Sequence, residues 1–143
     1  MHTLSPLGQS DESRVKQAIV SSKAPNPAGA YSPALRVGQL LFLSGQIPID
    51  PTSGQMVSGT VAVQTRRVMD NLGALLEAAG LSFNHVVRTT VFLTDMNDFA
   101  EFNEVYAACF AEPRPARATV QVARLPRDAR IEIDAIASYD ALV

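Results

Sequence analysis

The fold of this chain is decided by the stretch from residue 60 to residue 80, which reads TVAVQTRRVMDNLGALLEAAG. The apolar side chains of this stretch that recur at helical spacing are Val61, Val68, Leu72, Leu75, Leu76 and Ala79. Gly80 follows directly, and glycine commonly stands just past a helix C-terminus. The pattern predicts an amphipathic helix from about Thr60 to Ala79 that packs one apolar stripe against a core.

Shorter apolar runs on both sides of this helix predict strands. The expected strands are Gln17–Val20, Leu40–Leu43, His85–Thr94, Ala116–Ala123 and Ile131–Ser138. A second helix is expected over Asp98–Phe110, with Asp95 or Asn97 as its candidate cap. The order β-β-α-β-α-β-β predicts an α+β fold, a mixed β-sheet with two helices packed on one face.

Two of the expected strands, Leu40–Leu43 and Val86–Leu93, carry apolar side chains on both faces. Two helices cover only one face of a sheet, so an apolar second face needs a partner chain. We therefore expect a homo-oligomer.

Composition limits the class of protein. The chain has 143 residues, of which 47% are hydrophobic, and this suits one domain with a sizeable core. A net charge of −2 argues against a nucleic-acid partner. No apolar run is long enough to span a membrane. Residues 1–16 are expected to form a mobile tail without a secretory pattern, ahead of a single domain over 17–143, which favours a cytoplasmic protein.

Few residues are suited to metal or nucleophile chemistry. Cys109 is the only cysteine, and the histidines, His2 and His85, are far apart in sequence, so no metal site is expected. Polar residues do stand where apolar ones are expected, at Ser44, Asn103, Arg117 and Glu132. Their structural interpretation is a capping hydroxyl, a surface charge or a carboxylate beside a strand ladder, and the pattern by itself favours it.

An ordered set of motifs favours a functional interpretation of these polar residues instead. The motifs are Leu43-Ser-Gly-Gln-Ile-Pro48, Asp70-Asn-Leu72 with Glu77-Ala-Ala-Gly-Leu81, Thr89-Thr-Val-Phe92, Asp98-Phe99 with Asn103, Pro115-Ala-Arg117, Val122-Ala-Arg-Leu-Pro126 and Ile131-Glu-Ile133. Together they resemble the Rid family of reactive-intermediate deaminases, and its RidA branch in particular. The resemblance covers about Val20 to Ala137.

The resemblance implies a chorismate-mutase-like fold that assembles as a trimer, with sites in clefts between subunits. It also implies hydrolysis of reactive 2-imino or enamine acids, such as 2-iminopropanoate and 2-iminobutanoate, to 2-oxo acids and ammonia, without a metal or organic cofactor.

Site residues follow from the same motifs. The resemblance makes Arg117 the residue that binds the substrate carboxylate, and Glu132 the residue associated with the attacking water. A bidentate guanidinium suits a planar carboxylate, and burial of Glu132 would raise its pKa toward the working range. Ser44 is a further candidate catalytic residue. The other candidate binding residues are Tyr31, Gly45, Asn103 and Thr119, the last at a position that is often cysteine in the family.

Geometry leaves one question open. If Ala116–Ala123 and Ile131–Ser138 pair as a hairpin, Arg117 lies about 17 Å along the strand from the level of Glu132. Either the strands pair differently, or another chain completes the site. The functional alternatives are a non-catalytic module on the same scaffold that binds a small carboxylate ligand or a protein and, less favoured, an RNA-cleaving protein.

Overall fold

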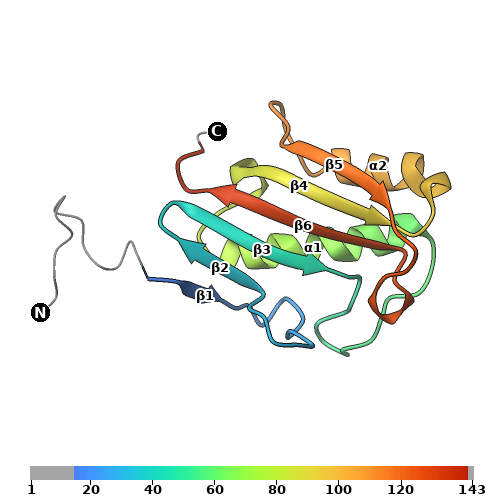
Figure 1. Ribbon diagram of the computed structural model, residues 1–143, viewed down its shortest axis with the longest axis horizontal. Coiled ribbons are helices and arrows are strands. Elements are labelled where there is room, and N and C mark those ends of the chain that lie inside the picture. Colours follow the sequence, from blue (N-terminus) through green and yellow to red (C-terminus); the bar gives the residue numbers. More distant parts are fainter. Residues whose placement is uncertain (1–14, 142–143) are drawn as a thin grey trace, which may run out of the picture.

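The computed structural model describes residues 15–141, so the expected tail, residues 1–16, lies almost wholly outside the described residues. Within this range six strands form one sheet in the order β1-β2-β3-β6-β4-β5. The two α-helices, α1 and α2, lie together behind the sheet (Figure 1). The predicted α+β class, one mixed sheet with two helices on one face, is confirmed.

The first three strands form an antiparallel meander of β1 (Gln17–Ile19), β2 (Ala34–Val37) and β3 (Leu40–Gln46). The strand β2 was not predicted from the sequence. This strand has only four residues between Pro33 and Gly38, too few to establish a period. A tight turn at Gly38, with φ of +58°, folds β2 back onto β3.

The second half of the sheet answers the question of strand pairing that the sequence left open. The chain runs from β4 (Val86–Leu93) through α2 (Phe99–Ala107) to β5 (Ala116–Gln121), and β5 pairs parallel with β4. The last strand, β6 (Ile131–Ser138), then enters between β3 and β4, antiparallel to both. Because a strand-helix-strand crossover favours parallel pairing, β5 is the outer strand and does not pair with β6.

The main helix, α1 (Val61–Ala78), begins and ends where the sequence predicts. The Thr60 hydroxyl accepts a hydrogen bond from the Val63 amide, and Gly80 takes a φ of +79° just beyond the helix. Its buried stripe also contains polar residues that the apolar pattern did not reveal, namely Gln64, Thr65 and Asn71. The second helix ends three residues earlier than predicted, and Asp95 caps the 3-10 turn Met96–Asp98 that leads into it.

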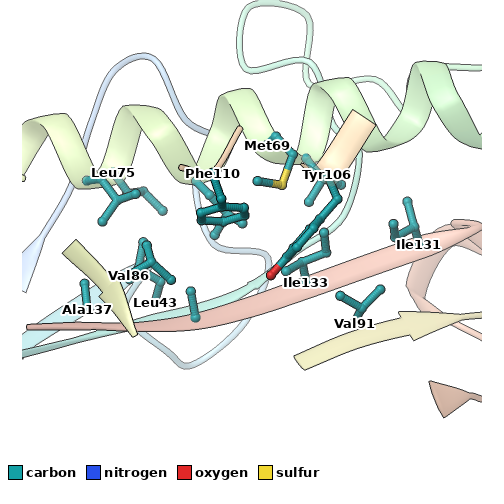
Figure 2. Close-up of a cluster of buried hydrophobic side chains, with 14 of the residues drawn as sticks. Leu43, Met69, Leu75, Val86, Val91, Tyr106, Phe110, Ile131, Ile133 and Ala137 are labelled. Atoms are coloured by element: carbon teal, nitrogen blue, oxygen red, sulfur yellow. The ribbon is translucent and has the colours of Figure 1, made fainter. Parts of the chain in front are cut away.

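The core fills the space between the helices and the sheet. Figure 2 shows side chains of both layers meeting there, among them Met69 and Leu75 of α1 and Ile131 and Ile133 of β6. Tyr106 of α2 joins this layer, and its hydroxyl lies 2.7 Å from the buried Thr89 hydroxyl of β4. The hydroxyl of Tyr106 therefore has a partner inside an otherwise apolar layer.

Among residues 15–141, no helix lies on the opposite face of the sheet (Figure 1). Leu40 and Phe42 of β3 and Val120 of β5 keep about two-fifths of their surface exposed, at 40%, 41% and 42%. This face therefore exposes apolar side chains as expected, alongside polar ones such as Asp134 and Ser138 of β6.

Candidate functional site

A cavity of about 260 Å³ opens where β3 ends and β6 begins. The residues lining it come from the loop before β2, the end of β3 with the segment after it, and the β5–β6 turn: Pro25–Gly29, Tyr31, Pro33, Gly45–Ile47, Ile49, Pro126, Arg127 and Glu132. The volume is close to the lower end of the range typical of small-molecule sites, about 300–1,000 Å³. The cavity is therefore suited to a small ligand.

Glu132 reaches this cavity because of strand alternation. Its neighbours Ile131 and Ile133 are buried toward the helices, so the Glu132 side chain stands on the other face of β6. Burial raises the pKa of the Glu132 carboxyl, and repulsion from the nearby Asp134 raises it further. This is the direction expected from the sequence, and it favours the protonated form of the carboxyl over a wider pH range than in water.

Gly45 makes room for that carboxyl. The register between β3 and β6 shifts between Leu43 and Gln46, so Ser44 and Gly45 form a bulge at the cavity. A Cβ at position 45 would stand 2.9 Å from Cδ and 3.1 Å from Cγ of Glu132. Only glycine therefore lets the strand backbone approach Glu132 this closely.

Ser44 lies beside the cavity and not in its lining. Its hydroxyl donates a 2.7 Å hydrogen bond to the carbonyl of Ser32, and its amide donates to the carbonyl of Pro33. These bonds fasten the loop that carries Tyr31, whose half-exposed ring lines the cavity. In the isolated chain Ser44 therefore acts on the site by holding this loop.

Arg117 and Asn103 form a second, separate site on the helix side of the sheet. The Arg117 Nη1 atom donates a 2.7 Å hydrogen bond to Oδ1 of Asn103. The guanidinium carbon of Arg117 lies 4.8 Å from the centre of the Tyr106 ring and 5.3 Å from that of Phe102. This arrangement orients a guanidinium at the edge strand, where its other N–H groups can bind an acceptor.

The two sites do not meet within one chain. Arg117 pairs with Thr89, which pairs in turn with Ala135, so Arg117 is level with Ala135 of β6. Glu132 lies three residues from Ala135 along β6, and two strand spacings separate β5 from β6. At about 3.3 Å per residue and about 4.8 Å per strand, the two Cα atoms are roughly 14 Å apart. Their side chains also stand on opposite faces of the sheet.

Thr119 follows Arg117 on the same face of β5. Its hydroxyl oxygen is buried and has no hydrogen-bond partner among the described residues. A buried hydroxyl without a partner is unfavourable by about 1–3 kcal/mol.

Several residues that shape the cavity were not predicted from the sequence. Gln64 donates to the carbonyl of Val57 and accepts from the amide of Arg130. Asn71 donates to the carbonyls of Ile47 and Ile49. These helix side chains hold the segments that flank the cavity. The available signal was a pair of amides inside the apolar stripe of α1.

Arg127 was also missed. It lies in the turn before β6, where Arg127 and Asp128 take φ values of +56° and +57°. Such a conformation is unfavourable for residues other than glycine, by about 1–2 kcal/mol each. The backbone at this turn therefore adopts a strained form beside the cavity.

Among residues 15–141, no group of three or more His, Cys, Asp or Glu side chains is placed to hold a metal ion. In the same range no helix has the length and apolarity needed to cross a membrane.

The fold and the cavity define a small α+β protein with a ligand-sized pocket at one end of its sheet. A family model described as Endoribonuclease L-PSP matches residues 21–139. The chain belongs to this family, which is the Rid family that its motifs resemble.

Individual relatives are similar to this chain over most of its length. A RutC family protein of Pyrococcus horikoshii is 54% identical over 123 residues, which are 86% of this chain and 98% of that protein. The mouse protein named 2-iminobutanoate/2-iminopropanoate deaminase is 49% identical over 123 residues, which are 86% of this chain and 91% of that protein. The crystal structure of RidA from an Antarctic Psychrobacter has a TM-score of 0.83 at 45% identity, covering 85% of this chain and 98% of that one.

Proposed function

We propose that this protein is an imine deaminase, which hydrolyses small 2-imino acids such as 2-iminopropanoate and 2-iminobutanoate to 2-oxo acids and ammonia. The observation that carries the proposal is the Glu132 carboxyl, partly buried in a ligand-sized cavity and held against the Gly45 backbone. Identity of 49% to a mammalian protein named for this activity supports it.

The chemistry uses water and these side chains. Glu132 accepts a proton from water as the water oxygen bonds to C2 of the substrate, and the electron pair of the C=N bond moves to nitrogen. Glu132 returns this proton to the nitrogen, and a second proton comes from solvent, so the nitrogen becomes an ammonium group. The C–N bond then breaks as the hydroxyl oxygen forms the C=O bond, and ammonia leaves. Loss of the remaining hydroxyl proton yields the 2-oxo acid. No redox partner is required by this balance.

The substrate carboxylate needs Arg117, which a single chain holds too far from Glu132. We infer that a trimer brings Arg117 of one subunit to the Glu132 cavity of the next. Two observations support a partner chain at the sheet: the apolar face bearing Leu40, Phe42 and Val120, and the position of Arg117 on an edge strand. Asn103 is then a positioning residue for Arg117, while Tyr31 and Gly45 line the substrate cavity.

The decisive experiment supplies 2-aminoacrylate from a serine dehydratase and follows the formation of 2-oxo acid with and without this protein. We expect Glu132→Gln to lose most of the acceleration over spontaneous hydrolysis. A matched control is Glu77→Gln, which removes an exposed carboxylate at the far end of α1.

Two outcomes would contradict the proposal. One is full activity in a folded Glu132→Gln variant, which would remove Glu132 from the reaction. The other is a wild-type protein that binds 2-oxo acids but accelerates no imine hydrolysis, which would favour the non-catalytic binding module.

Cleavage of RNA by the wild-type protein would support the activity that the family description names.

A further inference from the structure

Arg127 places a positive charge on the wall of the Glu132 cavity. Among the residues of the lining, Arg127 is the one basic side chain and Glu132 the one carboxyl group. The rest of the lining is mainly proline, alanine, glycine and isoleucine, which offer a substrate shape and apolar contact. A lone arginine on such a wall is therefore suited to recognising one specific acceptor.

The Arg127 side chain lines the cavity and is anchored to a neighbouring loop. Its Nη1 atom donates a 3.1 Å hydrogen bond to the carbonyl of Gly54, in the loop that follows the lining residue Ile49. A guanidinium has five N–H donors, and this bond occupies one of them. The backbone of Arg127 takes the unfavourable left-handed conformation in this position. The turn therefore holds the head group at the rim with donors to spare.

The charge of Arg127 is not balanced by its neighbours. No carboxylate among residues 15–141 forms an ion pair with it within 4.0 Å. Arg124 in the same turn differs, because it is paired with Asp128 at 2.8 Å. A carboxylate brought by a ligand would find Arg127 available and Arg124 engaged.

We propose that Arg127 makes this site accept 2-imino acids that carry a second carboxylate at the end of the side chain, that is, 2-imino dicarboxylic acids. This inference rests on the proposed function. With the C1 carboxylate on Arg117 and C2 beside Glu132, the substrate side chain extends along the apolar wall toward Arg127. The hydrolysis is unchanged, since water adds to C2 and ammonia leaves.

The test compares substrates with and without the distal carboxylate. The imines of glutamate and aspartate are generated by their flavin oxidases, and the imine of 2-aminobutyrate by a general amino-acid oxidase. The readout is kcat/KM for 2-oxo acid formation above the spontaneous rate. The variant is Arg127→Asn, because asparagine tolerates the left-handed backbone that this position requires. Arg124→Asn is the matched control, since it removes an arginine of the same turn that does not line the cavity.

We expect Arg127→Asn to lower kcat/KM for the dicarboxylic imines on the order of tenfold, as for a charge-assisted contact at a solvent-open rim. The kcat/KM for the 2-aminobutyrate imine should stay within about twofold of the wild-type value. The melting temperature should change by no more than a few degrees. Arg124→Asn should leave the ratio between substrates unchanged. Equal changes for both substrate classes, or no change, would overturn the assignment of Arg127.

A binding measurement separates this inference from the proposed function. Calorimetry compares 2-oxoglutarate with 2-oxopentanoate, which has the same chain length but lacks the second carboxylate. Preference for 2-oxoglutarate in the wild type, lost in Arg127→Asn, would support the Arg127 site even if no imine were hydrolysed. Absence of that preference, with 2-aminobutyrate imine still hydrolysed, would overturn the Arg127 assignment and leave the deaminase intact.

Discussion

A single methyl group at position 45 is expected to lower kcat/KM about a hundredfold. In Gly45→Ala the new Cβ would stand 2.9 Å from Cδ of Glu132, where carbon atoms in contact prefer about 3.5–4.0 Å. The carboxyl must therefore move by roughly 0.5–1 Å. A displacement of about 1 Å in a reacting group lowers rates on the order of a hundredfold, or about 2.7 kcal/mol of transition-state stabilisation.

The same substitution should leave the fold nearly as stable as before. The Glu132 carboxyl ends a flexible side chain in an open cavity, and shifting it off its preferred rotamer costs about 0.5–1.5 kcal/mol. Alanine also reduces the entropy of the unfolded chain, which offsets about 0.4–1 kcal/mol of this. The melting temperature should therefore change by less than about 5 °C.

The assay is the dehydratase-coupled hydrolysis of 2-aminoacrylate, with Gly73→Ala as control. A Cβ at position 73 would meet the Phe83 ring at 3.3 Å, so this variant adds a methyl group at a close but less crowded contact away from the cavity. The double variant Gly45→Ala with Glu132→Gln should be no slower than Glu132→Gln alone, because both changes act on one carboxyl. Additive losses in the double variant, or unchanged activity in Gly45→Ala, would refute this reasoning.

Three further predictions concern pH, carboxylate binding and assembly. Burial raises the folded-state pKa of Glu132, so ionisation of this carboxyl destabilises the fold once the pH exceeds 4.5, its ordinary pKa. The melting temperature of Glu132→Gln should therefore gain on that of the wild type as pH rises from 4.5, and the gain should vanish below that pH. A constant difference across that range would contradict this. Arg117→Lys keeps the charge but loses the planar fork, so KM for imines should rise by about tenfold or more at unchanged oligomeric state; an unchanged KM would argue against carboxylate binding there. Phe42→Asp, on the open sheet face, should yield monomers in sedimentation experiments and abolish activity, whereas an active trimer would place the interface elsewhere.

Periodic burial is the part of this structure that could be read from sequence. The α1 stripe and the alternation of Ile131 and Ile133 with Glu132 were both predicted, because a buried face imposes its period on the residues that form it. The buried amides of Gln64 and Asn71 could not be predicted from this period. They are buried with the stripe, and their partners are loop carbonyls that are close only after folding.

The local sequence pattern did not predict which strands pair with one another. β2 is too short to show a period, and the pairing of β5 with β4 depends on where α2 returns the chain. Family motifs supplied Glu132, Gly45 and Tyr31, which the structure brings to one cavity. The same motifs supplied Arg117, which the structure holds in a separate site with Asn103.

The amino-acid sequence by itself determined the class of fold, the family and the chemical type of the candidate residues, since these follow from periodicity and from side chains in a recognisable order. Only the tertiary structure decided that Glu132 and Arg117 stand on opposite faces of one sheet and that Arg127 joins the Glu132 cavity. The reason is physical: which side chains share a cavity depends on strand order and loop closure, and contacts between residues distant in the chain set both.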